Sequence, residues 1–177
     1  MSFPVANSTT SFWRGETHPL DDHRTTEKLP SEVDVVIIGA GYAGASIAYH
    51  LLEQGRGASK PLSIAILEAR EACSGATGRN GGHLKPDPYH RAADALKIYG
   101  REAAEEVAAF EARQIGEIKK LVEKENVDCD FVMTRAADVC LFEQAHSELK
   151  DGFDRLNAAD VSTIQNVFYS DGKTAEG

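Results

Sequence analysis

The clearest pattern of hydrophobic and polar positions runs from residue 31 to residue 67. The β-branched run Val35–Ile38 follows the lead-in segment Ser31–Asp34, and this order predicts a buried strand. A second apolar run, Leu62–Leu67, predicts another strand. Between them, apolar residues recur at the spacing of a helix that ends near Gly55: Ile47, Ala48, Leu51 and Leu52. The order strand, helix, strand predicts a βαβ unit with two parallel strands.

Three glycines with the spacing Gly-x-Gly-x-x-Gly separate the first predicted strand from the helix. Gly39 permits a tight turn, Gly41 lets a diphosphate approach the backbone, and Gly44 lets the helix pack close to the strand. Such a turn aims unpaired N–H groups and the positive end of a helix dipole at one point. The motif alone is weak evidence, because glycines cluster in many loops. The strand before it and the helix after it make it a candidate diphosphate site.

A carboxylate follows the second predicted strand, where a nucleotide-binding βαβ unit needs one. Glu68 stands directly after Leu67 and can accept hydrogen bonds from ribose hydroxyl groups. It would repel a 2′-phosphate, so the unit favours FAD or NAD over NADP. Taken alone, Glu68 would more often be a solvated loop carboxylate than a ribose ligand. Its place after the glycine turn and two strands favours the nucleotide interpretation.

A second glycine-rich segment, Cys73–Gly82 (the second glycine loop), helps to distinguish FAD from NAD. It has four glycines between residues 75 and 82, too many for an ordinary crossover helix. It also offers hydroxyl, amide and guanidinium groups, which suit contacts to a diphosphate, a ribityl chain or the edge of a flavin ring. The alternative is a flexible surface loop.

These segments together resemble the FAD-dependent amine and amino-acid oxidoreductases of the D-amino-acid oxidase superfamily. Val35–Gly44, Glu68–Arg70 and Gly75–Gly82 carry the resemblance, which covers roughly residues 11 to 170. Within the superfamily, the chain is similar to the γ-glutamylputrescine oxidoreductase-like branch. Three lead-in segments are similar to those of fungal members: Ser11–Arg14, His18–Leu20 and Leu29–Pro30.

The resemblance implies a flavoprotein that oxidises a C–N bond of a small-molecule amine or amino acid by hydride transfer to flavin. It places the first turn at the FAD diphosphate, Glu68 at the adenosine ribose and the second glycine loop along the flavin side. The expected cofactor-binding residues are Gly39, Ala40, Gly41, Tyr42, Ala43, Gly44, Glu68, Ala69, Arg70, Thr77, Arg79, Asn80, Gly81 and Gly82. No residue can be assigned as a catalytic base.

The rest of the chain does not continue a simple doubly wound pattern. We expect a helical region over about 89–124 that breaks near Gly100, an antiparallel hairpin of residues 129–133 and 138–142, and a helix over about 144–156. Residues 161–169 are ambiguous. The predicted fold class is therefore α/β, a Rossmann-like FAD-binding βαβ unit with the start of an α+β substrate domain.

The expected domain organisation has two parts. Residues 1–31 form an extended N-terminal arm, which Phe12 and Trp13 could pin to the domain. Residues 32–177 form the N-terminal part of the FAD-binding domain, with helices and the hairpin inserted at about 89–160. The family fold needs a considerably longer chain, so we expect a truncated member that alone binds FAD poorly and is inactive. A non-catalytic remnant and an NAD-dependent enzyme are the alternatives.

Composition narrows the partners. The net charge of −9 and the pI near 5.1 argue against nucleic-acid binding. The 42% hydrophobic and 27% charged residues are typical of a globular protein. The chain has no secretory signal and no apolar stretch of about 18 residues, so we expect no membrane partner and a cytoplasmic location.

The cysteines give no sign of a metal site or a disulfide. Cys73, Cys129 and Cys140 are odd in number and lack the spacing of zinc ligands. We expect reduced thiols, with Cys129 and Cys140 in the core, and no bound metal.

Overall fold

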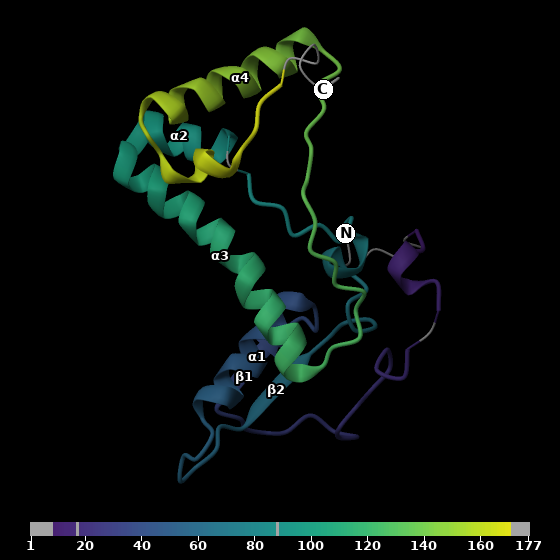
Figure 1. The fold of residues 1–177 in the computed structure, drawn as a ribbon. Coiled ribbons are helices and arrows are strands. Elements are labelled where there is room, and N and C mark those ends of the chain that lie inside the picture. The colour runs from purple at the N-terminus through teal and green to yellow at the C-terminus, as the bar shows by residue number, and fades with distance from the viewer. Residues whose placement is uncertain (1–8, 17, 88, 171–177) are drawn as a thin grey trace. The chain divides into compact units, whose positions relative to one another are not determined.

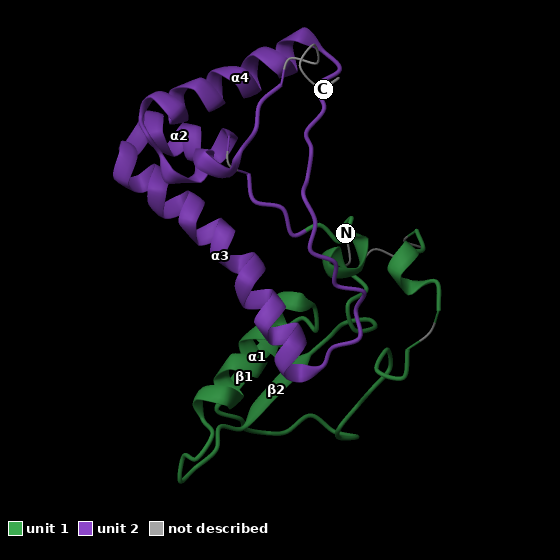
Figure 2. Ribbon diagram, in the orientation of Figure 1, with its two compact units in different colours: residues 1–83 green, residues 84–177 purple. Residues whose placement is uncertain are grey.

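The computed structural model describes residues 9–16, 18–87 and 89–170. The chain divides into two compact units, Met1–His83 (unit 1) and Leu84–Gly177 (unit 2), shown in green and purple in Figure 2. The elements of unit 1, with η for a 3₁₀ helix, are η1 (Phe12–Arg14), β1 (Val35–Ile38), α1 (Tyr42–Gln54), β2 (Ile64–Leu67) and η2 (Ala76–Arg79). Those of unit 2 are α2 (His90–Tyr99), α3 (Arg101–Glu125), α4 (Glu143–Ala158) and η3 (Ser162–Asn166) (Figure 1).

The predicted strand, helix and strand of unit 1 are confirmed. β1 and β2 pair in parallel, with Val35 opposite Ile64 and Ile38 opposite Leu67. Ile37 is buried, and its Cγ2 would lie 3.2 Å from a Cβ placed on Gly44 of α1. α1 therefore packs on the Ile37 face of the two strands.

The other face of this sheet has no cover of the same kind. Side chains alternate along a strand, so Val36 and Ile38 point away from the Ile37 face. Ile38 is 89% exposed and Val36 is 54% exposed. Parallel strands are usually buried on both faces, and here the buried face is the one that α1 covers.

A polar clamp joins the two strands at the ends where they begin. The backbone N–H of Asp34 donates to Ser63 Oγ at 2.9 Å, and the N–H and hydroxyl of Ser63 donate to Asp34 Oδ2 at 2.8 and 2.7 Å. These bonds from Ser63, first that of its hydroxyl, lower the pKa of Asp34. The clamp fixes the register of β1 and β2. Because the strands are parallel, the residues that follow Ile38 and Leu67 then lie side by side.

Unit 2 is a helical unit with a small-residue core. The predicted break at Gly100 is confirmed, and Gly100 has a φ of +89° between α2 and α3. A Cβ on Gly152 of α4 would lie 2.8 Å from the carbonyl oxygen of Tyr89, so this helix approaches the start of α2 closely. The buried core residues are Ala92, Ala93, Ala95, Ala104, Ala108, Leu156, Val161 and Ile164.

The predicted hairpin is wrong. Residues 129–133 and 138–142 form no strand, and the apolar side chains of Val132, Val139 and Leu141 are exposed. A two-stranded hairpin is marginal without a packed face, and these side chains have none. For the same reason Cys129 is exposed and Cys140 half-buried, so neither is the core residue that its neighbours suggested.

The structure also answers the expectations for residues 161–169 and for the start of the second strand. The ambiguous residues 161–169 contain η3, and β2 begins at Ile64 rather than Leu62. The division into an arm of residues 1–31 and a domain of residues 32–177 stays a prediction. No helix in the described part of the chain is both long and apolar enough to cross a membrane.

Candidate functional site

The site begins where β1 ends. The N–H of Gly39 donates to the carbonyl oxygen of Leu67 at 2.7 Å, which extends the ladder by one residue. Gly39 then turns with a φ of +103°, a conformation in which any other residue would be strained. The chain leaves the sheet sharply at this point, and α1 starts three residues later.

Two further glycines keep this turn tight. A Cβ on Gly44 would collide with the carbonyl oxygen of Gly39, so helix and turn can approach only with glycine there. A Cβ on Gly41 would lie 2.9 Å from Thr77 Oγ1, which is closer than real Cβ contacts. The close packing expected at Gly44 is thus seen in the structure, whereas the neighbour of Gly41 is the Thr77 hydroxyl, and the approach of a diphosphate to Gly41 stays a prediction.

The N-terminus of α1 faces a hydroxyl group from the second glycine loop. Gly41 is the N-cap residue and has no side chain to cap the helix. The N–H of Tyr42 instead donates to Thr77 Oγ1 at 2.9 Å. Because the hydroxyl accepts this bond, its own hydrogen is free to donate to an anion beside the positive end of the helix dipole.

Glu68 holds the turn from the side of β2. Its Oε2 accepts from the N–H of Ala40 at 2.8 Å, and its Oε1 accepts from the N–H groups of Ala69 and Arg70 at 2.9 and 3.0 Å. The bond from Ala40 is the largest cause that lowers the pKa of Glu68, against the opposing effect of desolvation. The carboxylate is therefore ionised at neutral pH, and its remaining lone pairs can accept hydroxyl donors.

The second glycine loop lies against the first turn. The N–H of Cys73 donates to the carbonyl oxygen of Ala40 at 3.0 Å, and Thr77 makes the contact to Tyr42 described above. Asn80 folds the loop on itself, because Nδ2 donates to the carbonyl oxygen of Thr77 and Oδ1 accepts from the N–H of Gly82, both at 2.7 Å. Two segments predicted separately thus form one surface.

Arg79 and the N-terminal arm make contacts that the sequence did not reveal. The Arg79 guanidinium donates to the hydroxyl of Thr9 at 2.8 Å, so in this structure it is engaged by the arm. Trp13 Nε1 donates to the carbonyl oxygen of Asn80 at 2.7 Å, whereas Phe12 is 87% exposed. Of the two aromatic residues expected to pin the arm, Trp13 does so and Phe12 does not.

The site's donors and acceptors fit the adenosine diphosphate part of a dinucleotide. The space beside Gly41 that a Cβ would fill, the Thr77 hydroxyl and the helix N-terminus suit a diphosphate. The carboxylate of Glu68 suits ribose hydroxyls. Among the described residues, no group of three or more His, Cys, Asp or Glu side chains could hold a metal ion.

Unit 2 has a cavity of its own, with a volume of about 560 Å³. An ion pair of Lys85 and Asp138 lies at its wall, beside apolar residues that include Leu141 and Phe142. Burial, followed by the charge of Asp138, raises the pKa of Tyr89 in this wall. The tyrosine therefore keeps its proton at neutral pH.

Comparison with known proteins gives a consistent picture. The sequence profile of the family described as "FAD dependent oxidoreductase" matches residues 34–167. The Gamma-glutamylputrescine oxidoreductase of Escherichia coli is 32% identical over 151 residues, which are 80% of this chain and 33% of that protein. The Probable oxidoreductase OrdL of Haemophilus influenzae is 30% identical over 98 residues, 55% of this chain and 21% of that protein. The match thus spans a third or less of either relative, and no solved structure matches.

Proposed function

The chain belongs to the family of FAD-dependent oxidoreductases, and from this premise we propose that unit 1 binds FAD at the glycine turn of residues 39–44. We further propose that the protein uses the bound flavin to oxidise a C–N bond of a small-molecule amine or amino acid. The family match decides between the two adenine dinucleotides in favour of FAD, so the NAD-dependent alternative is set aside.

One observation carries the cofactor proposal: Glu68 and the glycine turn form a single hydrogen-bonded unit. Glu68 Oε2 lies 2.8 Å from the N–H of Ala40, inside the Gly-x-Gly segment. The carboxylate of Glu68 is thus hydrogen-bonded directly to the turn that we propose to bind the diphosphate. In a nucleotide-binding βαβ unit a carboxylate at this position would hold the ribose hydroxyls and the glycine turn would hold the diphosphate, so the pairing suits an adenosine diphosphate.

The residues divide between the two ends of the cofactor in this proposal. Ala40, Tyr42 and Ala43, with the three glycines of the turn, line the diphosphate end, where the helix dipole and the Thr77 hydroxyl favour an anion. The N–H groups of Gly39, Ala40 and Tyr42 are already bonded to Leu67, Glu68 and Thr77. Glu68 takes the ribose hydroxyls, with Ala69 and Arg70 beside it. Thr77 joins the diphosphate end through its contact with Tyr42, and we assign Arg79, Asn80, Gly81 and Gly82 of the second glycine loop to the flavin side.

The proposed reaction rests on the family and on a relative's name. The flavin supplies a two-electron acceptor for the hydride that leaves the carbon next to nitrogen. The amine nitrogen loses its proton, and the product is an imine that water converts to a carbonyl compound and an amine. The E. coli relative is named for γ-glutamylputrescine, and we propose a substrate of the same general class, an amine or amino acid. A cytoplasmic location stays a prediction.

Anaerobic mixing with amines and amino acids tests this proposal on an FAD-loaded protein of full family length that contains this chain, because the chain, which matches a third or less of either relative, is expected to be inactive by itself. We expect loss of the oxidised-flavin absorbance with at least one amine, and its return on admission of oxygen or another acceptor. Flavin that binds but is reduced by no compound of this class would instead support a non-catalytic nucleotide-binding protein. A folded chain that binds no flavin would contradict both.

A further inference from the structure

The N-terminal arm holds the outer side of the second glycine loop at several points. The hydroxyl of Ser11 donates to the carbonyl oxygen of Gly78, and Trp13 Nε1 donates to that of Asn80 at 2.7 Å. A Cβ on Gly82 would lie 3.1 Å from Trp13 Cζ2, so the indole ring lies directly against the loop backbone. The arm therefore contacts the middle and the end of this loop.

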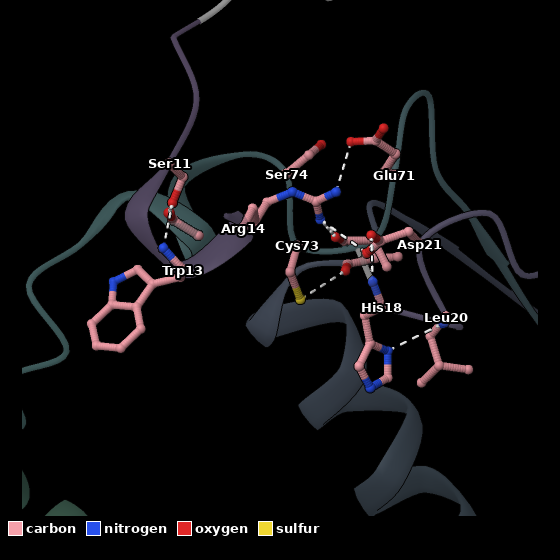
Figure 3. A network of polar contacts seen from close by, with 12 residues as sticks. Ser11, Trp13, Arg14, His18, Leu20, Asp21, Glu71, Cys73 and Ser74 are labelled. Atoms are coloured by element: carbon pink, nitrogen blue, oxygen red, sulfur yellow. Dashed lines mark hydrogen bonds and ion pairs between the residues drawn. The ribbon is translucent and has the colours of Figure 1, made fainter. Parts of the chain in front are cut away.

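Arg14 is the centre of this contact (Figure 3). Its guanidinium donates to the carbonyl oxygen of Ala72 and, at 2.7 Å, to Glu71 Oε2, and it pairs with Asp21 Oδ1 at 3.3 Å. The side chains of Arg14 and Asp21 are each only 17% exposed. One guanidinium thus joins two parts of the arm to the residues that lead into the second glycine loop.

The inner side of the same loop faces the first turn. Cys73, directly after Ala72, has a φ of +57°, a left-handed conformation that is costly for a residue other than glycine. Its N–H is nevertheless held 3.0 Å from the carbonyl oxygen of Ala40. The contacts of Arg14 at Glu71 and Ala72 fix the backbone on one side of this strained residue. The loop is therefore held between the arm and the glycine turn.

A loop with four glycines loses much conformational freedom when it is ordered. If the arm orders it beforehand, a cofactor binds without that loss. We propose that the arm, through Arg14 and Trp13, holds the second glycine loop in its cofactor-binding arrangement before FAD arrives. These are positioning residues, and the inference rests on the proposed FAD site.

Hydrogen exchange of the cofactor-free chain tests the positioning itself. We expect Arg14→Ala to speed exchange of amides in residues 71–82 and to leave residues 35–38, 45–54 and 101–125 unchanged. Arg24→Ala is the matched control, because Arg24 lies in the same arm and, within the described part of the chain, its guanidinium donates to the carbonyl oxygen of the nearby Glu27. Faster exchange throughout unit 1 would make Arg14 a general stability residue and would overturn the proposal. So would unchanged exchange in residues 71–82.

FAD affinity, measured by flavin fluorescence, separates positioning from simple charge. We expect Arg14→Ala to raise the Kd for FAD about tenfold and Arg24→Ala to leave it unchanged. Arg14→Lys keeps the charge but lacks the planar fork that reaches several acceptors, so it should also weaken binding. Glu71→Gln removes a negative charge, which favours an anion, yet positioning predicts weaker binding. Lysine as good as arginine, or tighter binding by Glu71→Gln, would overturn the proposal.

The two measurements also separate this inference from the proposed function. Slower exchange of residues 71–82 with an intact arm, in a wild-type chain that binds no FAD, would show that the arm orders the second glycine loop. It would contradict both the cofactor role of the arm and the FAD site. FAD binding that survives Arg14→Ala unchanged would support the site and overturn the role of the arm.

Discussion

The two units of this chain are held together in different ways. Among the described residues of unit 1 the buried apolar side chains are Ile37 and Ala48. Polar contacts hold much of this unit, among them those of Glu68 and Thr77 with the glycine turn and those of Arg14 in the arm. Unit 2 is held by packing, with eight buried residues that include five alanines. The two units should therefore respond differently to substitution. Unit 1 should be sensitive to an added Cβ atom or a lost polar partner, and unit 2 to the loss of a core side chain.

Truncation of a large core side chain in unit 2 should give the largest loss of stability. Leu156 is fully buried, so Leu156→Ala should lower the free energy of unfolding of unit 2 by about 3 kcal/mol. Hydrogen exchange of α2 and α3 measures it. Val139→Ala is the control, because Val139 is 78% exposed and its truncation should change stability by less than about 0.5 kcal/mol. Equal loss of protection in α1 would show that the two units do not unfold separately.

A single added methyl group should damage unit 1. In Gly44→Ala the new Cβ would collide with the Gly39 carbonyl oxygen, and we expect a loss of about 2 kcal/mol together with the loss of FAD binding. Gly116→Ala in α3 is the matched control. It meets no atom within 4 Å, and it should stabilise its helix by about 0.5–1 kcal/mol. Thermal unfolding and flavin fluorescence report the two effects, and a neutral Gly44→Ala would break the comparison.

The hydroxyl of Thr77 should matter for the cofactor more than for stability. Thr77→Val keeps the shape but removes the acceptor for the Tyr42 N–H and the donor to a bound anion, so FAD affinity should fall about tenfold. Thr77→Ser keeps the hydroxyl and should retain most of the affinity. Isothermal titration with FAD measures both variants. Equal affinities of the valine and serine variants would remove Thr77 from the site.

Glu68 should give the stability of unit 1 a small pH dependence. Its pKa in the folded chain is lowered from 4.5, so its stabilisation is complete above that value and is lost as the pH falls through the lower, folded-state value. The group is exposed, and the effect should stay below about 1 kcal/mol. Urea unfolding at several pH values should show the full loss in the wild type and in Glu32→Gln and a smaller loss in Glu68→Gln, where Asp34 still contributes because its pKa is lowered too. The same acid response in Glu68→Gln would contradict this assignment.

The glycine turn was predictable from the sequence because its determinants are local. Val35–Ile38, the three glycines and the apolar helix face stand next to one another, and Glu68 follows the next apolar run directly. Each glycine was expected where the structure shows a positive φ or a close approach, at Gly39, Gly41 and Gly44.

The arm and the hairpin were beyond such local reasoning. Arg14 and Glu71 are 57 residues apart, and no spacing rule joins a guanidinium to a carboxylate over that distance. The hairpin failed for a related reason. β-branched residues such as Val132 and Val139 prefer strands only where partners and a packed face exist, and here both side chains are exposed. In both cases the outcome depends on whether a residue finds packing or bonding partners elsewhere in the fold, which a local sequence pattern does not show.

An FAD titration with competing nucleotides tests the site most directly. The wild-type chain should change flavin fluorescence saturably, ADP should reverse the change, and ADP that carries a 2′-phosphate should not, because Glu68 is ionised and repels it. Gly44→Ala should abolish the response. A folded wild-type chain that leaves flavin fluorescence unchanged, or a 2′-phosphorylated nucleotide that competes as well as ADP, would contradict an FAD site built from the glycine turn and Glu68.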